Sequence, residues 1–207
     1  MLGIVFATSE EAAPFVEQHA GGRLDEVEEG LHLEAGDVLV TVTGPGKIKA
    51  TLRTERLLRQ HDLDVLMHAG GATALTDELE GGTLVGATFV LEGDRVALDT
   101  LAYPRMPLDC PFDSLTEGTL VSQDHTDDED SEEQRYWERI ADVRDTTGYA
   151  VAYVAAQHGT SCHIVKGVTV RAGAEASSES TRQQEVYETV ATFLHEHAEA
   201  IASDSSS

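Results

Sequence analysis

Residues 64–75 read DVLMHAGGATAL, an apolar run that ends in small residues. The apolar side chains within Asp64–His68 predict a buried strand, and Ala69–Ala72 predicts a turn at its carboxyl end. In α/β folds, ligands bind at the carboxyl ends of the strands. This stretch therefore predicts one strand of an α/β sheet, followed directly by part of a binding site.

The order of strand, small residues and helix recurs along the chain. Further strands are expected at Leu2–Ala7, Val38–Thr43, Gly86–Leu91, Arg95–Leu98, Thr119–Val121 and His163–Val170. Helices are expected after Ser9 and over Lys47–Gln60, Thr147–His158 and Ser180–Ala202, with Gln123–Gln134 as a loop or surface helix and Leu101–Leu115 as a loop. The pattern predicts one three-layer α/β domain over residues 1–202, with a mostly parallel central mixed sheet flanked by helices, and a disordered tail over residues 203–207.

The carboxyl ends of the expected strands select the candidate site segments. These are Thr8–Glu11, Thr43–Lys47, His68–Thr73, Ser122–Thr126, Arg144–Gly148 and Val168–Ala172.

The chain is strongly acidic. It holds 38 acidic and 14 basic residues, for a formal net charge of −24, and its only lysines are Lys47, Lys49 and Lys166. Nucleic-acid binding is disfavoured, because few cations are present to neutralise phosphates. An acidic, lysine-poor chain repels itself at low ionic strength, whereas molar salt shortens the screening length to about 3 Å. The composition therefore indicates a salt-accumulating, halophilic source.

We predict that this protein needs salt to stay folded. Transfer from molar salt into dilute buffer should lower its melting temperature and reduce its ordered structure, because charge repulsion is then unscreened. Thermal unfolding followed by circular dichroism in both buffers measures the effect. An unchanged melting temperature after dialysis would contradict the halophilic interpretation.

Several other classes of protein are disfavoured. The sequence contains no apolar run of about 18 residues, so no membrane association is expected. The first residues read as a strand rather than a signal peptide, which predicts a cytoplasmic protein. Cys110 and Cys162 show no metal-binding or redox spacing and are expected to be free thiols. His125 lies in an acidic stretch without regular ligand spacing, so we expect neither a metal nor a cofactor.

Four stretches carry a family resemblance. They are GIVFATSEEAAPF (residues 3–15), VTVTGPGKIKATLRTERLL (40–58), DVLMHAGGATAL (64–75) and TTGYAVAYVAAQHGTSCHIVKGVTV (146–170). Together they resemble the nucleoside phosphorylase/nucleosidase family, especially its methylthioadenosine/S-adenosylhomocysteine nucleosidase branch. The resemblance implies a nucleoside phosphorylase-like fold and cleavage of the N-glycosidic bond of a purine nucleoside. That chemistry calls for a carboxylate that positions water and an acid that protonates the leaving base, as in glycoside hydrolysis.

Carried over by position, the resemblance retains the water-positioning carboxylate but loses the acid and the family's ribose-binding glutamate. The water-positioning glutamate falls on Glu11, the expected catalytic residue. The ribose-binding glutamate falls on Thr147, and the acid falls on Val170, which has no proton to donate. A positioned acid contributes about 10²–10⁴ in rate. The standard mechanism therefore cannot operate unmodified.

Several ways around the missing acid remain open. Under a shifted alignment Glu175 would be the acid, or Asp145 or Asp124 could supply the proton from a neighbouring loop. The leaving group could also need little protonation, with donors from the loops sufficing. Alternatively, the site has drifted and binds nucleosides without cleaving them.

The remaining predicted substrate-binding residues lie in the strand-end segments. They are Thr8, Gly46, His68, Gly70, Gly71, Asp124 and Thr126, together with Asp145, Thr147 and Val170. The first and third strand-end loops lack the arginines that hold phosphate in phosphorylases of this family, which favours hydrolysis over phosphorolysis. The expected partner is a small-molecule nucleoside, with phosphate as a further candidate if the protein is a phosphorylase. The resemblance also implies a homo-oligomer, a dimer or larger.

Overall fold

The computed structural model describes residues 1–19, 28–94, 104–125, 132–172 and 179–204. Its strands are β1 (Leu2–Phe6), β2 (His32–Ala35), β3 (Val38–Val42), β4 (Val65–Ala74), β5 (Leu84–Glu92), β6 (Arg105–Pro107), β7 (Thr116–Ser122), β8 (Val143–Asp145) and β9 (Ser161–Arg171). Its helices are α1 (Ser9–His19), α2 (Lys47–Gln60), α3 (Glu132–Trp137), α4 (Gly148–His158) and α5 (Glu179–Asp204).

The nine strands of the described residues belong to one sheet, in the order β2-β3-β1-β4-β8-β7-β5-β6, with β9 paired to both β4 and β5. The second pairing of β9 closes β4, β8, β7, β5 and β9 into a ring. The pairs β1–β3, β1–β4, β4–β9, β5–β7 and β7–β8 are parallel, and β2–β3, β4–β8, β5–β6 and β5–β9 are antiparallel. The sheet is therefore mixed, and the prediction of a mostly parallel sheet was wrong.

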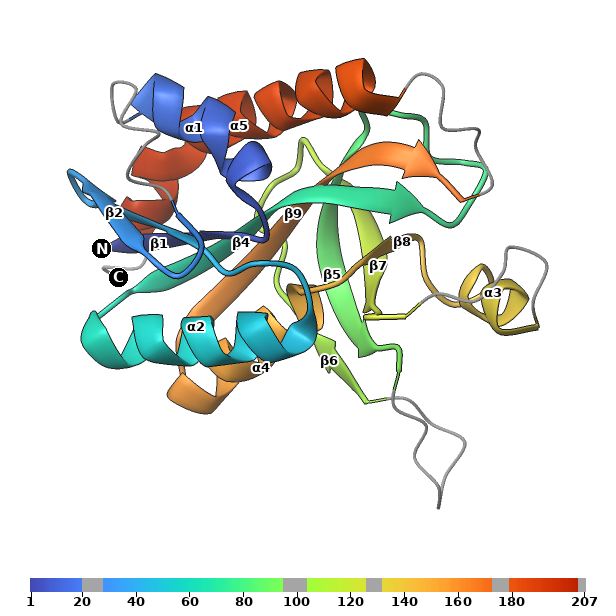
Figure 1. The fold of residues 1–207 in the computed structure, drawn as a ribbon, viewed down its shortest axis with the longest axis horizontal. Helices are drawn as coiled ribbons and strands as arrows, with labels where there is room; N and C mark the ends of the chain where they lie inside the picture. The colour runs from blue at the N-terminus through green and yellow to red at the C-terminus, as the bar shows by residue number, and fades with distance from the viewer. Residues whose placement is uncertain (20–27, 95–103, 126–131, 173–178, 205–207) are drawn as a thin grey trace.

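Helices cover the sheet on both faces. Helices α1 and α5 pack against each other on one face, and α2 and α4 pack together on the other (Figure 1). The core on the first side joins apolar residues of β1 and β4, among them Phe6 and Met67, to Phe15 of α1 and Phe193 of α5. This arrangement confirms an α/β domain with a sheet between two helical layers.

Two predicted segments differ from the structure. The predicted turn at Ala69–Ala72 is part of β4, because these residues continue the ladder with β9, where Gly70 pairs with Lys166. The predicted loop at Leu101–Leu115 contains β6, which pairs with β5. The prolines had indicated a loop, but Pro107 ends this three-residue strand, where a missing backbone N–H is tolerated.

Other predictions are settled only in part. The expected strand at Arg95–Leu98 lies outside the described residues. Helix α5 continues through Asp204, so the first two residues of the predicted tail are helical, and residues 205–207 lie outside the described part. Cys110 and Cys162 are free, as predicted. Within the described ranges, no helix is long and apolar enough to span a membrane.

Candidate active site

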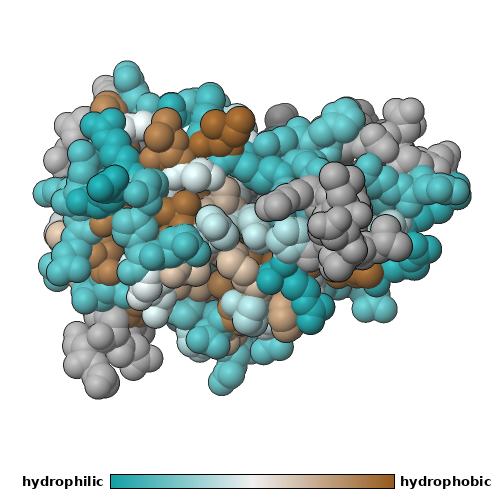
Figure 2. Space-filling model, turned by 90° about the horizontal axis from the view of Figure 1, so that it is seen from below, coloured by the Kyte–Doolittle hydropathy of each residue, from teal (hydrophilic) through white to brown (hydrophobic). Residues whose placement is uncertain are grey.

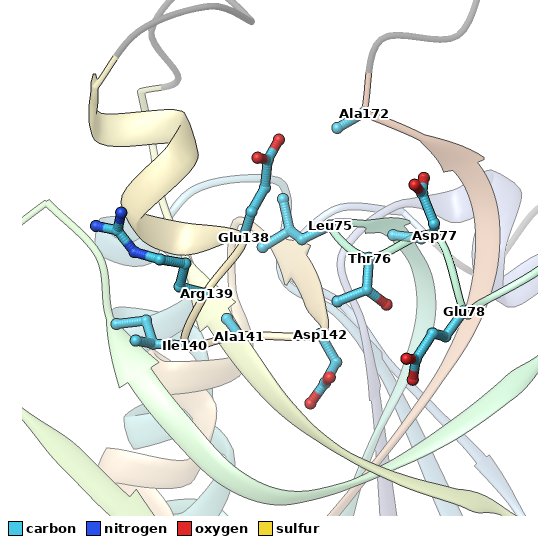
Figure 3. A pocket seen from close by; sticks show the side chains of 11 residues that line it. Leu75, Thr76, Asp77, Glu78, Glu138, Arg139, Ile140, Ala141, Asp142 and Ala172 are labelled. Carbon is cyan, nitrogen blue, oxygen red and sulfur yellow. The ribbon is translucent and has the colours of Figure 1, made fainter.

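A cavity of about 190 Å³ lies at the carboxyl ends of β1, β4 and β8. Its lining residues are Ala7, Glu11, Gly71, Ala72, Thr73, Arg144, Asp145, Thr146, Thr147, Lys166, Thr169 and Tyr187. Two larger cavities, of about 690 and 700 Å³, contain none of the residues predicted to be catalytic or substrate-binding. The first of these lies between the end of β4 and the chain after α3, where Asp77, Glu138 and Arg139 line it (Figure 3). The smaller cavity is therefore the candidate active site.

Glu11 is held in this cavity by backbone amides. It lies in the first turn of α1 and is 7% exposed. Its Oε2 accepts hydrogen bonds from the N–H groups of Ala7 (2.9 Å) and Thr8 (3.1 Å), and its Oε1 accepts one from the N–H of Gly71 (2.9 Å). Three fixed donors set the position of the carboxylate, and its oxygens retain lone pairs that can accept from a ligand. Thr8, which was predicted to bind substrate, therefore contributes to the site through its backbone N–H, which helps to position Glu11.

Gly70 leaves the space that the Glu11 carboxylate occupies. A Cβ at Gly70 would lie 2.6 Å from the carboxyl carbon of Glu11, and the φ of Gly70 is +144°. Only glycine readily adopts that backbone conformation. This glycine pair, which was expected in a turn, therefore shapes the cavity from within β4: Gly70 makes room for Glu11, and the N–H of Gly71 donates to it.

His68 lies behind the cavity and is fully buried. Its Nδ1 lies 2.9 Å from the carbonyl oxygen of Val5, which can only accept, so Nδ1 carries the proton. The pKa of His68 is lowered mainly by burial and further by the nearby Lys166 ammonium, so the ring is neutral. Its Nε2 then accepts from Lys166 Nζ (2.8 Å), with Thr147 Oγ1 3.0 Å away. The neutral ring cannot donate to Asp145 Oδ2, which lies 3.3 Å from Nε2.

We predict a pH-dependent stability from His68. Because the pKa of the folded-state ring is lowered, unfolding takes up a proton below pH about 6.5, and the free energy of unfolding should fall by up to about 1.4 kcal/mol per pH unit between pH 6.5 and 5. His32, whose pKa is also lowered by burial, adds to the slope. Denaturant unfolding should show a shallower dependence on pH in His68→Asn than in the wild-type protein. Equal slopes in the variant and the wild type would refute the assignment.

Asp145 and Lys166 form a buried ion pair beside His68. Lys166 Nζ lies 2.8 Å from Asp145 Oδ2, and the two side chains are 1% and 5% exposed, respectively. The Asp145 carboxylate also accepts from Ser122 Oγ (2.6 Å) and from the N–H of Gly148 (2.9 Å). Burial alone would raise the pKa of Asp145, but the neighbouring Lys166 ammonium holds it well below its usual range.

These contacts weigh against two of the predicted roles. Asp145 is ionised and its oxygens are occupied, so it has no proton to supply to a leaving base. The hydroxyl of Thr147 is 3.0 Å from His68 Nε2 and 3.3 Å from Asp145 Oδ2, so it is engaged within the buried network. Thr147 lines the cavity, but its hydroxyl is already engaged with His68 and Asp145.

The other predicted residues lie at the margin of the cavity or outside the described part. Asp124 Oδ1 accepts from the N–H of Lys47 (2.9 Å), and the N–H of Gly46 donates to Thr146 Oγ1 (3.4 Å), which links this neighbouring cluster to the cavity. Thr126 and Glu175 lie outside the described residues. Val170 pairs with Thr73 in the sheet and does not line the cavity.

Sequence reasoning did not select Lys166 and Tyr187, which line the cavity, and it placed Arg144 at the start of a candidate segment without assigning it a role. Lys166 carried a signal, because it is a lone lysine inside the apolar run of β9. Tyr187 comes from α5, and the ring lies close to Gly71, where a Cβ would be 3.1 Å from Tyr187 Cε1. Burial and the neighbouring carboxylates of Glu11 and Glu10 raise the pKa of Tyr187 to about 12, so its phenol is protonated.

A family model described as the phosphorylase superfamily matches residues 1–203. The chain belongs to the phosphorylase superfamily. Over 98 residues it is 32% identical to the 5'-methylthioadenosine/S-adenosylhomocysteine nucleosidase of Shewanella halifaxensis. That match covers 45% of this chain and 42% of the relative, so less than half of the relative's length is spanned.

Solved structures of the superfamily confirm the fold. The Helicobacter pylori 5'-methylthioadenosine/S-adenosylhomocysteine nucleosidase with butyl-thio-DADMe-Immucillin-A superposes with a TM-score of 0.79 at 19% identity, over 96% of this chain and 97% of the other. The native futalosine hydrolase of Helicobacter pylori gives 0.78 at 19% identity, over 96% and 97%. The apo 5'-methylthioadenosine nucleosidase of Arabidopsis thaliana gives 0.80 at 19% identity, over 97% and 95%.

Proposed function

We propose that this superfamily member hydrolyses the N-glycosidic bond of a purine nucleoside, with Glu11 holding the attacking water. The observation that carries the proposal is the Glu11 carboxylate, fixed by three backbone N–H groups in a cavity at the strand ends. Relatives named for methylthioadenosine, S-adenosylhomocysteine and futalosine support a nucleoside as the ligand.

The chemistry of the cavity suits this reaction. As the bond to the base breaks, positive charge builds on the sugar, and a nearby carboxylate stabilises that charge. Glu11 can accept a hydrogen bond from water while its backbone donors keep it in place. The protonated phenol of Tyr187, beside Gly71, is a further donor for the water or the sugar.

Two observations favour a second candidate, a nucleoside-binding protein without activity. Val170 stands where the family acid is expected, and the hydroxyl of Thr147 is engaged with His68 and Asp145. A protein that had lost catalysis could retain the cavity and bind its ligand.

Base release separates these functions. In molar salt, the protein is incubated with methylthioadenosine, adenosine and inosine, with and without phosphate, and the free base is quantified by chromatography. Release without phosphate supports hydrolysis, whereas release only with phosphate would replace it with phosphorolysis. Thermal stabilisation by a nucleoside without release would establish the binding protein instead.

We also propose that the chain forms a homo-oligomer through α2 and α4. These helices pack side by side and expose large apolar side chains, with Ile48, Leu52 and Tyr153 exposed by 82%, 68% and 45%. Figure 2 views this side of the molecule, where hydrophobic patches interrupt the hydrophilic surface. On a chain with a net charge of −24, such a face is best explained by contact with a second copy.

This face gives a prediction about assembly. Changing Ile48 and Leu52 together to glutamate should convert a dimer or larger assembly into monomers, because four carboxylates would meet at a two-fold interface. Light scattering after size exclusion in molar salt measures the mass, with Ile140→Glu, which alters an exposed isoleucine in the chain after α3, as the control. A monomeric wild-type protein would overturn the oligomer proposal.

A further inference from the structure

Three residues lie in line across the sheet beside the cavity. Thr73 of β4 pairs with Arg144 of β8 on one side and with Val170 of β9 on the other. The register of β4 with β9 shifts between Ala72 and Thr73. Strands lie about 4.8 Å apart, so Arg144 emerges about 10 Å from the position where the family acid is expected. Thr73 and Arg144 line the cavity with Glu11.

The guanidinium of Arg144 has donors to spare. The side chain is half-buried, and its Nη1 donates to Gln134 Oε1 at 2.8 Å. No carboxylate of the described residues lies within 4.0 Å of its nitrogens. Burial lowers the pKa of Arg144, while Glu133 and Glu138 act in the opposite direction, and a guanidinium stays charged at neutral pH. Of its five N–H donors, one is used by Gln134.

The planar guanidinium of Arg144 can distinguish 6-oxopurines from 6-aminopurines. A guanidinium donates two parallel hydrogen bonds to N7 and O6 of a 6-oxopurine, both of which are acceptors. A 6-aminopurine presents N7 as an acceptor but an amino group at position 6, which is a donor and opposes the N–H groups of arginine. A carboxylic acid at position 170 could protonate a leaving aminopurine, but the valine that stands there has no proton to donate.

We propose that Arg144 recognises the leaving base, and that this cavity takes 6-oxopurine nucleosides, such as inosine and guanosine, in preference to 6-aminopurine nucleosides. The inference rests on the proposed function and names its substrate class. The bond between C1′ and N9 breaks with its electron pair moving to the base, while the oxygen of water bonds to C1′. The guanidinium stabilises the charge that builds on the base, and the proton released by the water ends on the departed base.

Free bases test the proposal without requiring turnover. Titration calorimetry in molar salt compares hypoxanthine with adenine for the wild-type protein, Arg144→Gln, Arg144→Lys and the exposed control Arg139→Gln. Hypoxanthine should bind the wild type and Arg139→Gln about 10-fold or more tightly than adenine. Arg144→Gln should remove that preference by weakening hypoxanthine alone, and Arg144→Lys, which keeps the charge without the fork, should retain only part of it.

Three results would overturn the proposal: a preference for adenine in the wild type, equal weakening of both bases in Arg144→Gln, or an effect of Arg144→Gln on phosphate binding with the base preference intact. The last would assign Arg144 to phosphate. A hypoxanthine preference lost in Arg144→Gln, together with no base release from any nucleoside, would uphold base recognition and reject hydrolysis. The two proposals therefore fail on different measurements.

Discussion

Replacing Lys166 with methionine should lower the free energy of unfolding by about 3–5 kcal/mol. Lys166 is the cation of a buried ion pair, 2.8 Å from Asp145, and the two side chains are 1% and 5% exposed. Methionine fills a similar volume but leaves the Asp145 carboxylate buried without its cation, which is the costly way to break such a pair. Denaturant unfolding in molar salt measures the loss.

A surface lysine provides the matched control. Lys49 pairs with Glu29 at 2.8 Å, but the two side chains are 49% and 40% exposed, so Lys49→Met should cost less than about 1 kcal/mol. Combining Lys166→Met with Asp145→Asn should recover part of the loss, because the buried charge is then removed. A Lys166→Met variant as stable as Lys49→Met would show that the ion pair does not stabilise the fold.

Replacing Glu11 with glutamine should reduce base release by about 10²–10⁴-fold. The amide has nearly the same shape, but its NH₂ group must face either the backbone N–H groups of Ala7 and Thr8 or that of Gly71. It also carries no negative charge to stabilise the sugar as positive charge develops. Initial rates of base release at saturating nucleoside measure the effect.

Glu10 is the internal control for this substitution. It lies one residue earlier in α1 and is exposed. Glu10→Gln should therefore leave base release within about two-fold of the wild type, since an exposed surface change is usually near neutral. Unchanged release in Glu11→Gln would remove Glu11 from the mechanism, and comparable losses in both variants would indicate a general charge effect rather than a specific role.

The parts of the site that sequence could predict are those encoded locally. Glu11 follows a strand end and lies in the first turn of a helix, and Gly70 and Gly71 directly follow the apolar run of β4. Each of these signals needs only a few neighbouring residues. The structure brings them together because β1 and β4 are adjacent and parallel, so their carboxyl ends meet at one edge.

The parts that sequence reasoning missed depend on distant pairing. Strand β8 has only three residues, Val143–Asp145, too few for a periodic pattern, and it forms because β4 and β7 lie on either side of it. The roles of Arg144 and Lys166 follow from that pairing and from the register of β9. The antiparallel pairing of β9 with β5 also joins segments that are far apart in the chain, so no local sequence pattern indicates it. The sheet was therefore expected to be mostly parallel.

The central claim is that this cavity carries out hydrolysis with water held by Glu11. The most direct test is base release from inosine by the wild-type protein in phosphate-free molar salt, using water labelled with heavy oxygen. We predict equimolar free base and sugar, with the label incorporated on the sugar, and loss of that release in Glu11→Gln. Absence of base release, or release only after phosphate is added, would contradict the claim.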